Sequence, residues 1–134
     1  MADKLFELKI ITPDRAFYQG NVSMLELNTS EGRIGVYADH LPVAMVLSPG
    51  VANIHEADGT VKEAALHSGF MEITKTRITV LAEVAEWPDE IDFNRAEEAR
   101  IRAERRLASH DSQIDVVRAE FALKKALTRI ELKN

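Results

Sequence analysis

The sequence predicts an α+β protein, in which a β-sandwich or barrel is followed by two similar helices. The first observation behind this prediction is that all six glycines and all four prolines lie at or before Pro88. Because glycine and proline are the strongest breakers of regular structure, we expect helix in the 46 residues from Asp89 to Asn134. The second is that short apolar segments alternate with turn residues before Pro88, which is typical of a sandwich or barrel. We expect a β domain over residues 1–88 and a helical domain over residues 89–134.

Four features of the first domain predict strands and turns. Leu5–Ile11 and Val22–Leu27 each combine apolar residues with some alternation, and each ends at turn-forming residues. Gly32 and Gly35 are expected to bracket a tight bend. Val43–Leu47 is apolar throughout, so we expect a fully buried strand there.

Two β-hairpins are predicted next. The first joins Val51–Glu56 to Val61–Leu66 across Asp58-Gly59, a strong short-range hairpin signal. The second joins Phe70–Thr74 to Arg77–Leu81 through two residues. These strands carry no recognisable catalytic set, glycine-rich phosphate loop or metal-ligand spacing, which argues against an enzyme. We expect the histidines of this domain to be structural or solvated: His40, His55 and His67.

Each predicted helix begins with a similar pattern. Ile91-Asp92-Phe93-Asn94-Arg95-Ala96 recurs 23 residues later as Ile114-Asp115-Val116-Val117-Arg118-Ala119, with a turn expected over residues 109–112. Each copy places a carboxylate three residues before an arginine, where a side chain can cap a helix. The apolar stripe of the first helix consists mostly of small residues: Ala96, Ala99, Ala103 and Leu107. Such a thin stripe removes little apolar area from water, so we expect the helical hairpin to dock weakly on the β domain. A weakly docked hairpin could occupy two positions relative to that domain.

Charge separates the two domains. Residues 1–88 carry seven basic and twelve acidic side chains, whereas residues 89–134 carry ten of each. The acidic first domain argues against nucleic acid as a partner. In the second domain two interpretations stay open. The charged residues form a solvated face, or the folded hairpin gathers Arg95, Arg102, Lys125 and Arg129 around an anion such as phosphate.

The composition excludes other classes of protein. Apolar residues make up 46% and charged residues 29% of the 134 residues, which are values of folded domains. No apolar run approaches the roughly 20 residues of a membrane-spanning helix, and the start lacks the apolar core of a signal peptide. There is no cysteine for a disulfide or a metal site. We expect a soluble protein of a reducing compartment.

Several short motifs, in order along the chain, resemble one family. They are Thr12-Pro13-Asp14, Gly32–Pro42, Ser68–Ile73, Ile78–Ala82 and the Ile91-Asp92-x-x-Arg95-Ala96 motif. Over essentially its full length the chain resembles the epsilon subunit of bacterial F-type ATP synthases, and its tail resembles the nucleotide-binding type from bacilli. Ala38 and Ser68 depart from the usual proline and glycine, both in turns.

The resemblance implies a ten-stranded β-sandwich, an antiparallel two-helix hairpin and a non-catalytic rotor subunit of a proton-translocating ATP synthase. The sandwich would bind the gamma subunit and the c-ring, using loops from Glu31 to His40. The hairpin would switch between a compact form and an extended form that reaches the α/β hexamer and inhibits ATP hydrolysis. The residues that would contact the β subunits are Arg118, Lys124, Lys125 and Arg129. The subunit would lie at the cytoplasmic face of the bacterial cell membrane, as a peripheral part of the complex.

The resemblance also implies that ATP, possibly with magnesium, binds the compact form as a regulatory ligand. Asp92 and Glu86 would orient adenine or neighbouring arginines, Ile91 and Ala96 would pack the base, and the cations would neutralise phosphates. Lys125 stands where the family often has arginine, and lysine lacks the planar fork that grips phosphate. The site carried over consists of Glu86, Ile91, Asp92, Arg95, Ala96, Arg102, Lys125 and Arg129.

Two alternatives remain open at this point. In one, the same rotor subunit inhibits mechanically without ATP, and its charged face only binds protein. In the other, the chain is an unrelated β-sandwich adaptor with a helical tail.

Overall fold

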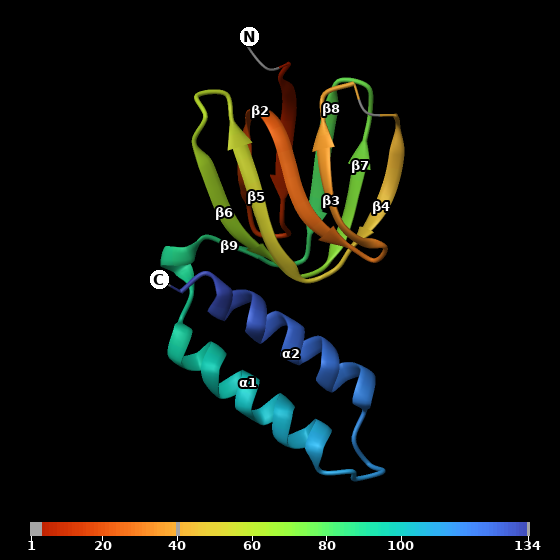
Figure 1. The fold of residues 1–134 in the computed structure, drawn as a ribbon, viewed down its shortest axis with the longest axis vertical. Helices are drawn as coiled ribbons and strands as arrows, with labels where there is room; N and C mark the ends of the chain where they lie inside the picture. Colours follow the sequence, from red (N-terminus) through yellow and green to blue (C-terminus); the bar gives the residue numbers. More distant parts are fainter. Residues whose placement is uncertain (1–3, 40, 134) are drawn as a thin grey trace.

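The computed structural model describes residues 4–39 and 41–133. Within this part, nine strands and a short 3-10 helix precede two α-helices. Figure 1 shows the strands as one body and the two helices side by side at one end of it. The strands are β1 (Phe6–Ile11), β2 (Ala16–Thr29), β3 (Gly32–Tyr37), β4 (Val43–Leu47), β5 (Gly50–Glu56), β6 (Val61–Leu66), β7 (Gly69–Ile73), β8 (Arg77–Ala82) and β9 (Ala85–Glu86).

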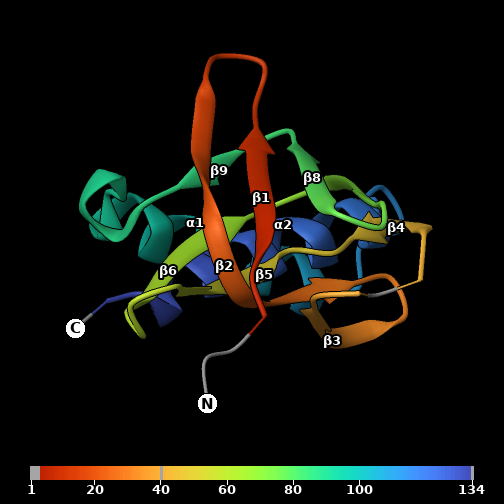
Figure 2. The same cartoon turned by 90° about the horizontal axis from the view of Figure 1, so that it is seen from above.

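The long strand β2 joins the two layers of the sandwich. Its first half pairs with β1, which also runs parallel to β8, and its second half pairs with β3 and β5. Seen from above, β1 and the start of β2 run side by side over the helices (Figure 2). Strands β8, β7 and β4 complete one side, while β5, β6 and β9 follow each other on the other. β9 thus emerges beside β6, directly before the helical tail.

Alternation along the strands produces the core. In β1 the side chains of Phe6, Leu8 and Ile10 are buried, while those between them are partly exposed. This is the period of two expected for a strand with one face on a core. The largest fully buried side chains come from five other strands as well, among them Leu25, Leu27, Val36, Ile54, Met71 and Val80.

Several sequence expectations need correction. The sandwich has nine strands among the described residues, not ten. Val43–Leu47 is a strand, but only Leu47 is buried, because this strand lies at the surface of one layer. No bend separates Gly32 from Gly35, since both lie in β3 and the turn precedes them. β2 starts at Ala16 rather than Val22.

Both predicted hairpins are confirmed. β5 pairs with β6 across Asp58-Gly59, where Gly59 has the positive φ of 90° that such turns require. β7 pairs with β8 across Lys75-Thr76.

The tail is helical with two interruptions, at residues 91–92 and at residues 109–115. A 3-10 helix, η1 (Pro88–Glu90), is followed by Ile91 with extended backbone angles, then by α1 (Phe93–Ala108) and α2 (Val116–Glu131). The expectation of helix from Asp89 onward was therefore wrong at Ile91 and Asp92. Asp92 caps α1 by accepting the Arg95 N–H, and Asp115 caps α2 by accepting the Arg118 N–H. The repeated pattern thus marks two helix starts.

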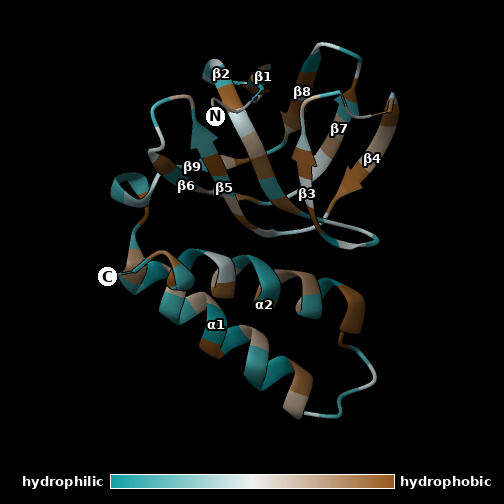
Figure 3. Ribbon diagram, turned by 45° about the horizontal axis from the view of Figure 1, so that its top comes forward, coloured by the Kyte–Doolittle hydropathy of each residue, from teal (hydrophilic) through white to brown (hydrophobic). Residues whose placement is uncertain are grey.

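α2 lies between the sandwich and α1, which faces outward (Figures 1 and 3). The buried side chains within the two helices are small: Ala96 and Ala103 of α1, and Ala119, Ala126 and Thr128 of α2. Val117 and Phe121, the second apolar row of α2, are exposed. No described helix has the length and apolar character that crossing a membrane would need.

Candidate functional site

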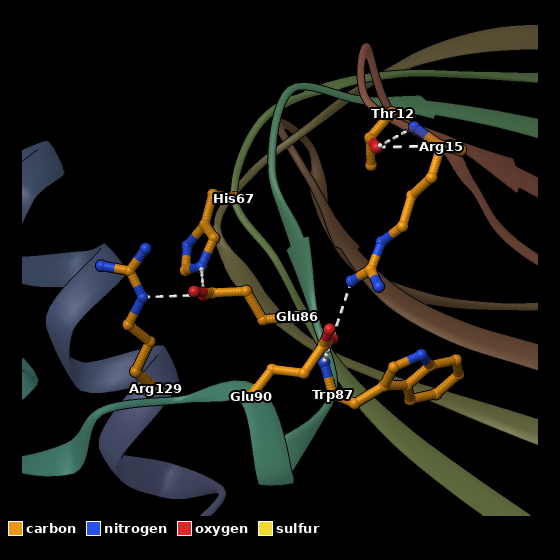
Figure 4. Close-up of polar contacts among 7 residues, drawn as sticks. All are labelled: Thr12, Arg15, His67, Glu86, Trp87, Glu90 and Arg129. Atoms are coloured by element: carbon orange, nitrogen blue, oxygen red, sulfur yellow. Dashed lines mark hydrogen bonds and ion pairs between the residues drawn. The ribbon is translucent and has the colours of Figure 1, made fainter.

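The candidate site lies where β9 leads into the tail, and it is organised around Glu86. One oxygen of its carboxylate, Oε1, accepts a hydrogen bond from Nε of Arg129 at 2.7 Å and lies 2.8 Å from Nε2 of His67 (Figure 4). His67 follows β6, Glu86 ends β9, and Arg129 belongs to α2. Three segments far apart in sequence therefore meet at one carboxylate.

The pairing of strands explains why Glu86 and His67 meet. In the register of β6 with β9, Ala65 lies opposite Glu86 and Leu66 opposite Ala85. The backbone N–H of His67 then donates to the carbonyl of Val84. β9 therefore carries the Glu86 side chain to the imidazole that follows β6.

The charge state of Glu86 follows from its surroundings. Its partial burial raises the pKa, but the hydrogen bonds with His67 and Arg129 outweigh burial and lower the pKa from 4.5 to about 2. Glu86 is thus a carboxylate near neutral pH and acts only as an acceptor. His67 Nε2 must then carry the hydrogen of the contact between them.

His67 is buried more completely than its partners, with 1% of its side chain exposed. Its other ring nitrogen, Nδ1, is also buried and has no hydrogen-bond partner among the described residues. From the sequence, His67 is expected to be structural or solvated, and no sequence signal indicates its contact with Glu86. No spacing relates residues 67, 86 and 129, so only the strand register could have revealed their meeting.

A second set of contacts fastens η1 to the sandwich. Glu90 accepts hydrogen bonds from Arg15 at 2.7 Å and from the Trp87 N–H at 2.9 Å (Figure 4). The hydrogen bond from Arg15 is the main reason that the pKa of Glu90 is lowered. Trp87 stacks on Phe17 with ring centroids 4.2 Å apart and meets Tyr18 edge-on. The segment between the two domains is therefore held by the Arg15–Glu90 ion pair, by the hydrogen bond from the Trp87 N–H to Glu90, and by the stacking of Trp87 on Phe17.

The residues expected to bind ATP divide into four groups: an ion pair, two buried apolar residues, a helix cap and three other cations. Glu86 and Arg129 are in direct contact, and Ile91 and Ala96 are buried, Ile91 in a cluster with Leu132 at the end of α2. Asp92 caps α1, as its simplest interpretation predicted. Of the four cations, only Arg129 contacts a carboxylate among the described residues, and Arg95 and Arg102 are exposed without an ion pair there. Lys125 places its ammonium 5.2 Å from the centre of the Phe121 ring.

The residues expected to bind other subunits lie mostly at the surface. Glu31 is exposed in the turn between β2 and β3, and Arg118 and Lys124 are exposed on α2. His40 lies outside the described residues. A groove of about 390 Å³ separates part of α2 from the sandwich, with Lys124 and Arg33 among its lining residues.

Other polar clusters supply little chemistry. His55 contacts Glu26 at 2.7 Å within the sandwich, far along β5 from the tail. Arg100 bridges Glu97 and Glu104 on α1. No group of three or more histidine and carboxylate side chains within residues 4–39 and 41–133 could hold a metal ion.

Comparison with family models and known proteins gives consistent matches. Residues 5–88 match the beta-sandwich domain of the ATP synthase Delta/Epsilon chain, and residues 89–134 match its long alpha-helix domain. The ATP synthase epsilon chain of Caldanaerobacter subterraneus subsp. tengcongensis is 40% identical over 98% of this chain and 96% of its own. That of Shouchella clausii is 40% identical over 94% and 92%, respectively.

Two solved structures share the fold. A chain of the Euglena gracilis mitochondrial ATP synthase, OSCP/F1/c-ring, matches with a TM-score of 0.83 and 22% identity, over 98% of this chain and 82% of that one. A chain of the Tetrahymena thermophila central stalk/c-ring structure matches with a TM-score of 0.57 and 16% identity, over 98% and 96%. At these identities the two likenesses concern the fold alone.

Proposed function

This chain belongs to the ATP synthase delta/epsilon family, and we propose that its hairpin is a regulatory element that responds to ATP. The chain is a non-catalytic subunit of the central stalk of a proton-driven F-type ATP synthase. It is therefore part of a membrane-associated complex that contains the c-ring.

The observation that carries the proposal is the contact between Glu86 and Arg129. The two side chains come from different domains, and they can meet only while α2 is docked on the sandwich. A ligand bound between them would therefore bind the compact hairpin and not an extended one. Such a ligand stabilises the compact form by RT ln(1 + [L]/Kd), about 1.4 kcal/mol at tenfold excess over Kd.

The charges around this contact suit a nucleotide. Arg95 and Arg102 lie seven residues apart on α1, and Lys125 and Arg129 lie four apart on α2, so each pair shares a side of its helix. Three of these four cations make no ion pair within the described residues, which leaves them available to phosphate oxygens. Phosphates, with or without magnesium, would then compete with Glu86 for Arg129.

The base would occupy the part of the site beside Glu86 and Asp92. Within the described residues no hydrogen bond reaches Oε2 of Glu86, so this oxygen can accept one from an amino group such as that of adenine. Ile91 and Ala96 are largely buried by the protein itself. They would form the floor beneath the base.

Contacts with other subunits follow the division into domains. Val46 of β4 is 60% exposed, and Phe70 of β7 and Leu81 of β8 are also exposed. Exposed apolar residues on neighbouring strands mark a protein-binding face, and we assign this one to the gamma subunit. The loops from Glu31 to His40 would meet the c-ring. An extended hairpin would bring Arg118 and Lys124 to the α/β hexamer, which restrains hydrolysis, at the cytoplasmic face of the bacterial membrane.

An ATP titration of the isolated full-length subunit tests the proposal, with calorimetry and amide NMR as readouts. We expect saturable binding that shifts the amides of residues 92–102 and 125–129. Arg95→Ala should weaken this binding at least tenfold, through loss of one charge-assisted contact. Arg105→Ala is the matched control, because Arg105 lies on the opposite side of α1 from the buried alanines. No binding at several millimolar ATP, or equal losses in both variants, would contradict the proposal.

One observation favours a second candidate, a hairpin that regulates mechanically without ATP. Glu86 and Arg129 already neutralise each other in the absence of a ligand, and Lys125 is directed to Phe121 rather than to an anion site. In this case the charged face of the hairpin serves only protein contacts. Absence of ATP binding together with normal inhibition by the assembled subunit would support it.

A further inference from the structure

We propose that His67 is a positioning residue, which holds the Glu86 carboxylate in place for Arg129 and so docks α2 on the sandwich. The part of this inference that concerns docking stands on the contacts alone. The part that concerns nucleotide affinity rests on the proposed function, because Glu86 and Arg129 belong to the proposed ATP site.

The position of Glu86 is set from the sandwich side. Its Oε1 atom lies 2.8 Å from His67 Nε2 and 2.7 Å from Arg129 Nε, so one atom joins the two domains. The backbone of His67 is itself fixed, because its N–H donates to the Val84 carbonyl. The next residue, Ser68, is fixed as well: its carbonyl accepts from the Glu83 N–H, and its hydroxyl donates to the Glu83 carboxylate. The imidazole therefore offers its Nε2–H from a rigid base.

The burial of His67 argues that this contact is its role. Its Nδ1 is the one buried side-chain polar atom without a partner in the described part of the chain. A buried polar group without a hydrogen bond is destabilising, so an apolar side chain would fill this position better. A histidine is favoured here only if its other nitrogen does something that an apolar side chain cannot. The Nε2–Glu86 contact is that interaction.

Loss of the Nε2–H of His67 should weaken the docking of α2, although His67 itself does not hydrogen-bond to that helix. Without it, the Glu86 side chain can turn away from Arg129, and α2 loses its ion pair with the sandwich. The remaining docking surface is small, because the buried side chains of the hairpin are mostly alanines. The compact form should then open more often, and a nucleotide that binds it should bind more weakly.

Two variants of similar size separate positioning from simple filling of space. In His67→Gln the side-chain amide reaches the place of Nε2 and can donate to Glu86, whereas in His67→Asn it reaches only the place of Nδ1. Amide hydrogen exchange over residues 116–131 without ATP reports docking, since undocked helices of this length are marginal. Calorimetry reports ATP affinity.

We expect His67→Asn to lower protection of α2 about tenfold and to raise the Kd for ATP about tenfold, the effect of one lost hydrogen bond to a charge. His67→Gln should stay within about threefold of the wild type in both readouts. His55→Asn is the control, since it breaks a similar pair with Glu26 that does not touch the hairpin. Unchanged protection in His67→Asn, or equal losses in the Gln and Asn variants, would overturn the inference.

The outcomes also separate this inference from the proposed function. If the wild-type subunit binds no ATP, the proposed function fails, while exchange of α2 still decides the role of His67. A measurement on the wild type guards against variants that do not fold. NMR of the ¹⁵N-labelled imidazole should find the proton of His67 on Nε2, and a proton on Nδ1 alone would overturn the inference.

Discussion

The sandwich and the hairpin of this protein are built from different kinds of packing. The sandwich buries large side chains completely, among them Leu8, Ile10 and Ile54. The helices bury Ala96, Ala119 and other small residues, and a groove remains between α2 and the strands. Since the hydrophobic contribution scales with the apolar area buried, the sandwich can fold by its own core whereas the hairpin depends on docking. We therefore expect the hairpin to leave its docked position at a lower cost in free energy than unfolding of the sandwich.

The largest effect should come from a cavity in the sandwich. Leu25→Ala removes a fully buried side chain and should lower the free energy of unfolding by about 3 kcal/mol. Denaturant unfolding followed by fluorescence measures this, because Trp87 is the only tryptophan and stacks on Phe17 of the sandwich. Leu127→Ala, an exposed position on α2, should change the same value by less than about 1 kcal/mol. Similar losses in both variants would remove the distinction between the two regions.

The converse experiment displaces the hairpin and spares the sandwich. Ala126→Leu inserts three carbons where a buried alanine leaves no room, and overpacking of this kind costs about 1–3 kcal/mol. We expect exchange over residues 93–131 to accelerate while the sandwich amides and Trp87 fluorescence stay unchanged. A matched Val117→Leu change at an exposed site of α2 should have no effect. Loss of sandwich protection in Ala126→Leu would mean that the two regions unfold together.

Acidification tests the ion pair that joins the regions. The pKa of Glu86 is lowered from 4.5 to about 2 in the folded state, so its contribution to docking is fully present above about pH 4.5. It is lost as the pH falls through about 2, because the proton then removes the charge that Arg129 and His67 bind. We expect docking of α2 to weaken over this range in the wild type. Glu86→Gln should show weaker docking at neutral pH and a smaller change on acidification.

The smallest of these effects should come from the helix caps. Asp92→Ala removes the acceptor for the Arg95 N–H and should destabilise the start of α1 by about 1 kcal/mol. Asp115→Ala does the same to α2 and should be similar in size. If Asp92 also orients a nucleotide, only Asp92→Ala should weaken ATP binding. Equal ATP affinity in the two variants would leave Asp92 as a cap alone.

Much of the fold could be predicted from the sequence, because its signals are local. The Asp58-Gly59 turn and the carboxylates at Asp92 and Asp115 depend on neighbours within a few residues, and the structure confirms all three. β2 begins at Ala16, six residues before the predicted Val22, and contains Gly20. A Cβ there would lie 2.9 Å from the Tyr18 hydroxyl oxygen, so this glycine makes room for an aromatic ring within a strand.

The errors and omissions come from non-local packing. Val43–Leu47 is apolar, yet only Leu47 is buried, because composition alone does not tell which face of a strand the core covers. The pairing of His67 with Glu86 and of Glu86 with Arg129 depends on strand register and on helix docking, neither of which has a sequence period. The residues carried over by resemblance included Glu86 and Arg129, but nothing in the family motif pointed to His67.

The fastening of η1 to the sandwich determines how the hairpin could travel. Arg15, Glu90 and the stack of Trp87 on Phe17 hold the chain up to Glu90, so a hairpin that left the sandwich would rotate at the next residues, Ile91 and Asp92. These two residues would then be the hinge. α1, which has 16 residues, would move as a rigid helix about 24 Å long, at 1.5 Å per residue. A turn of about 30° at the hinge would carry the tip of the hairpin about 12 Å, given that length. A change of one or two backbone torsions beside Glu86 would thus be amplified into a displacement on the scale of a neighbouring subunit.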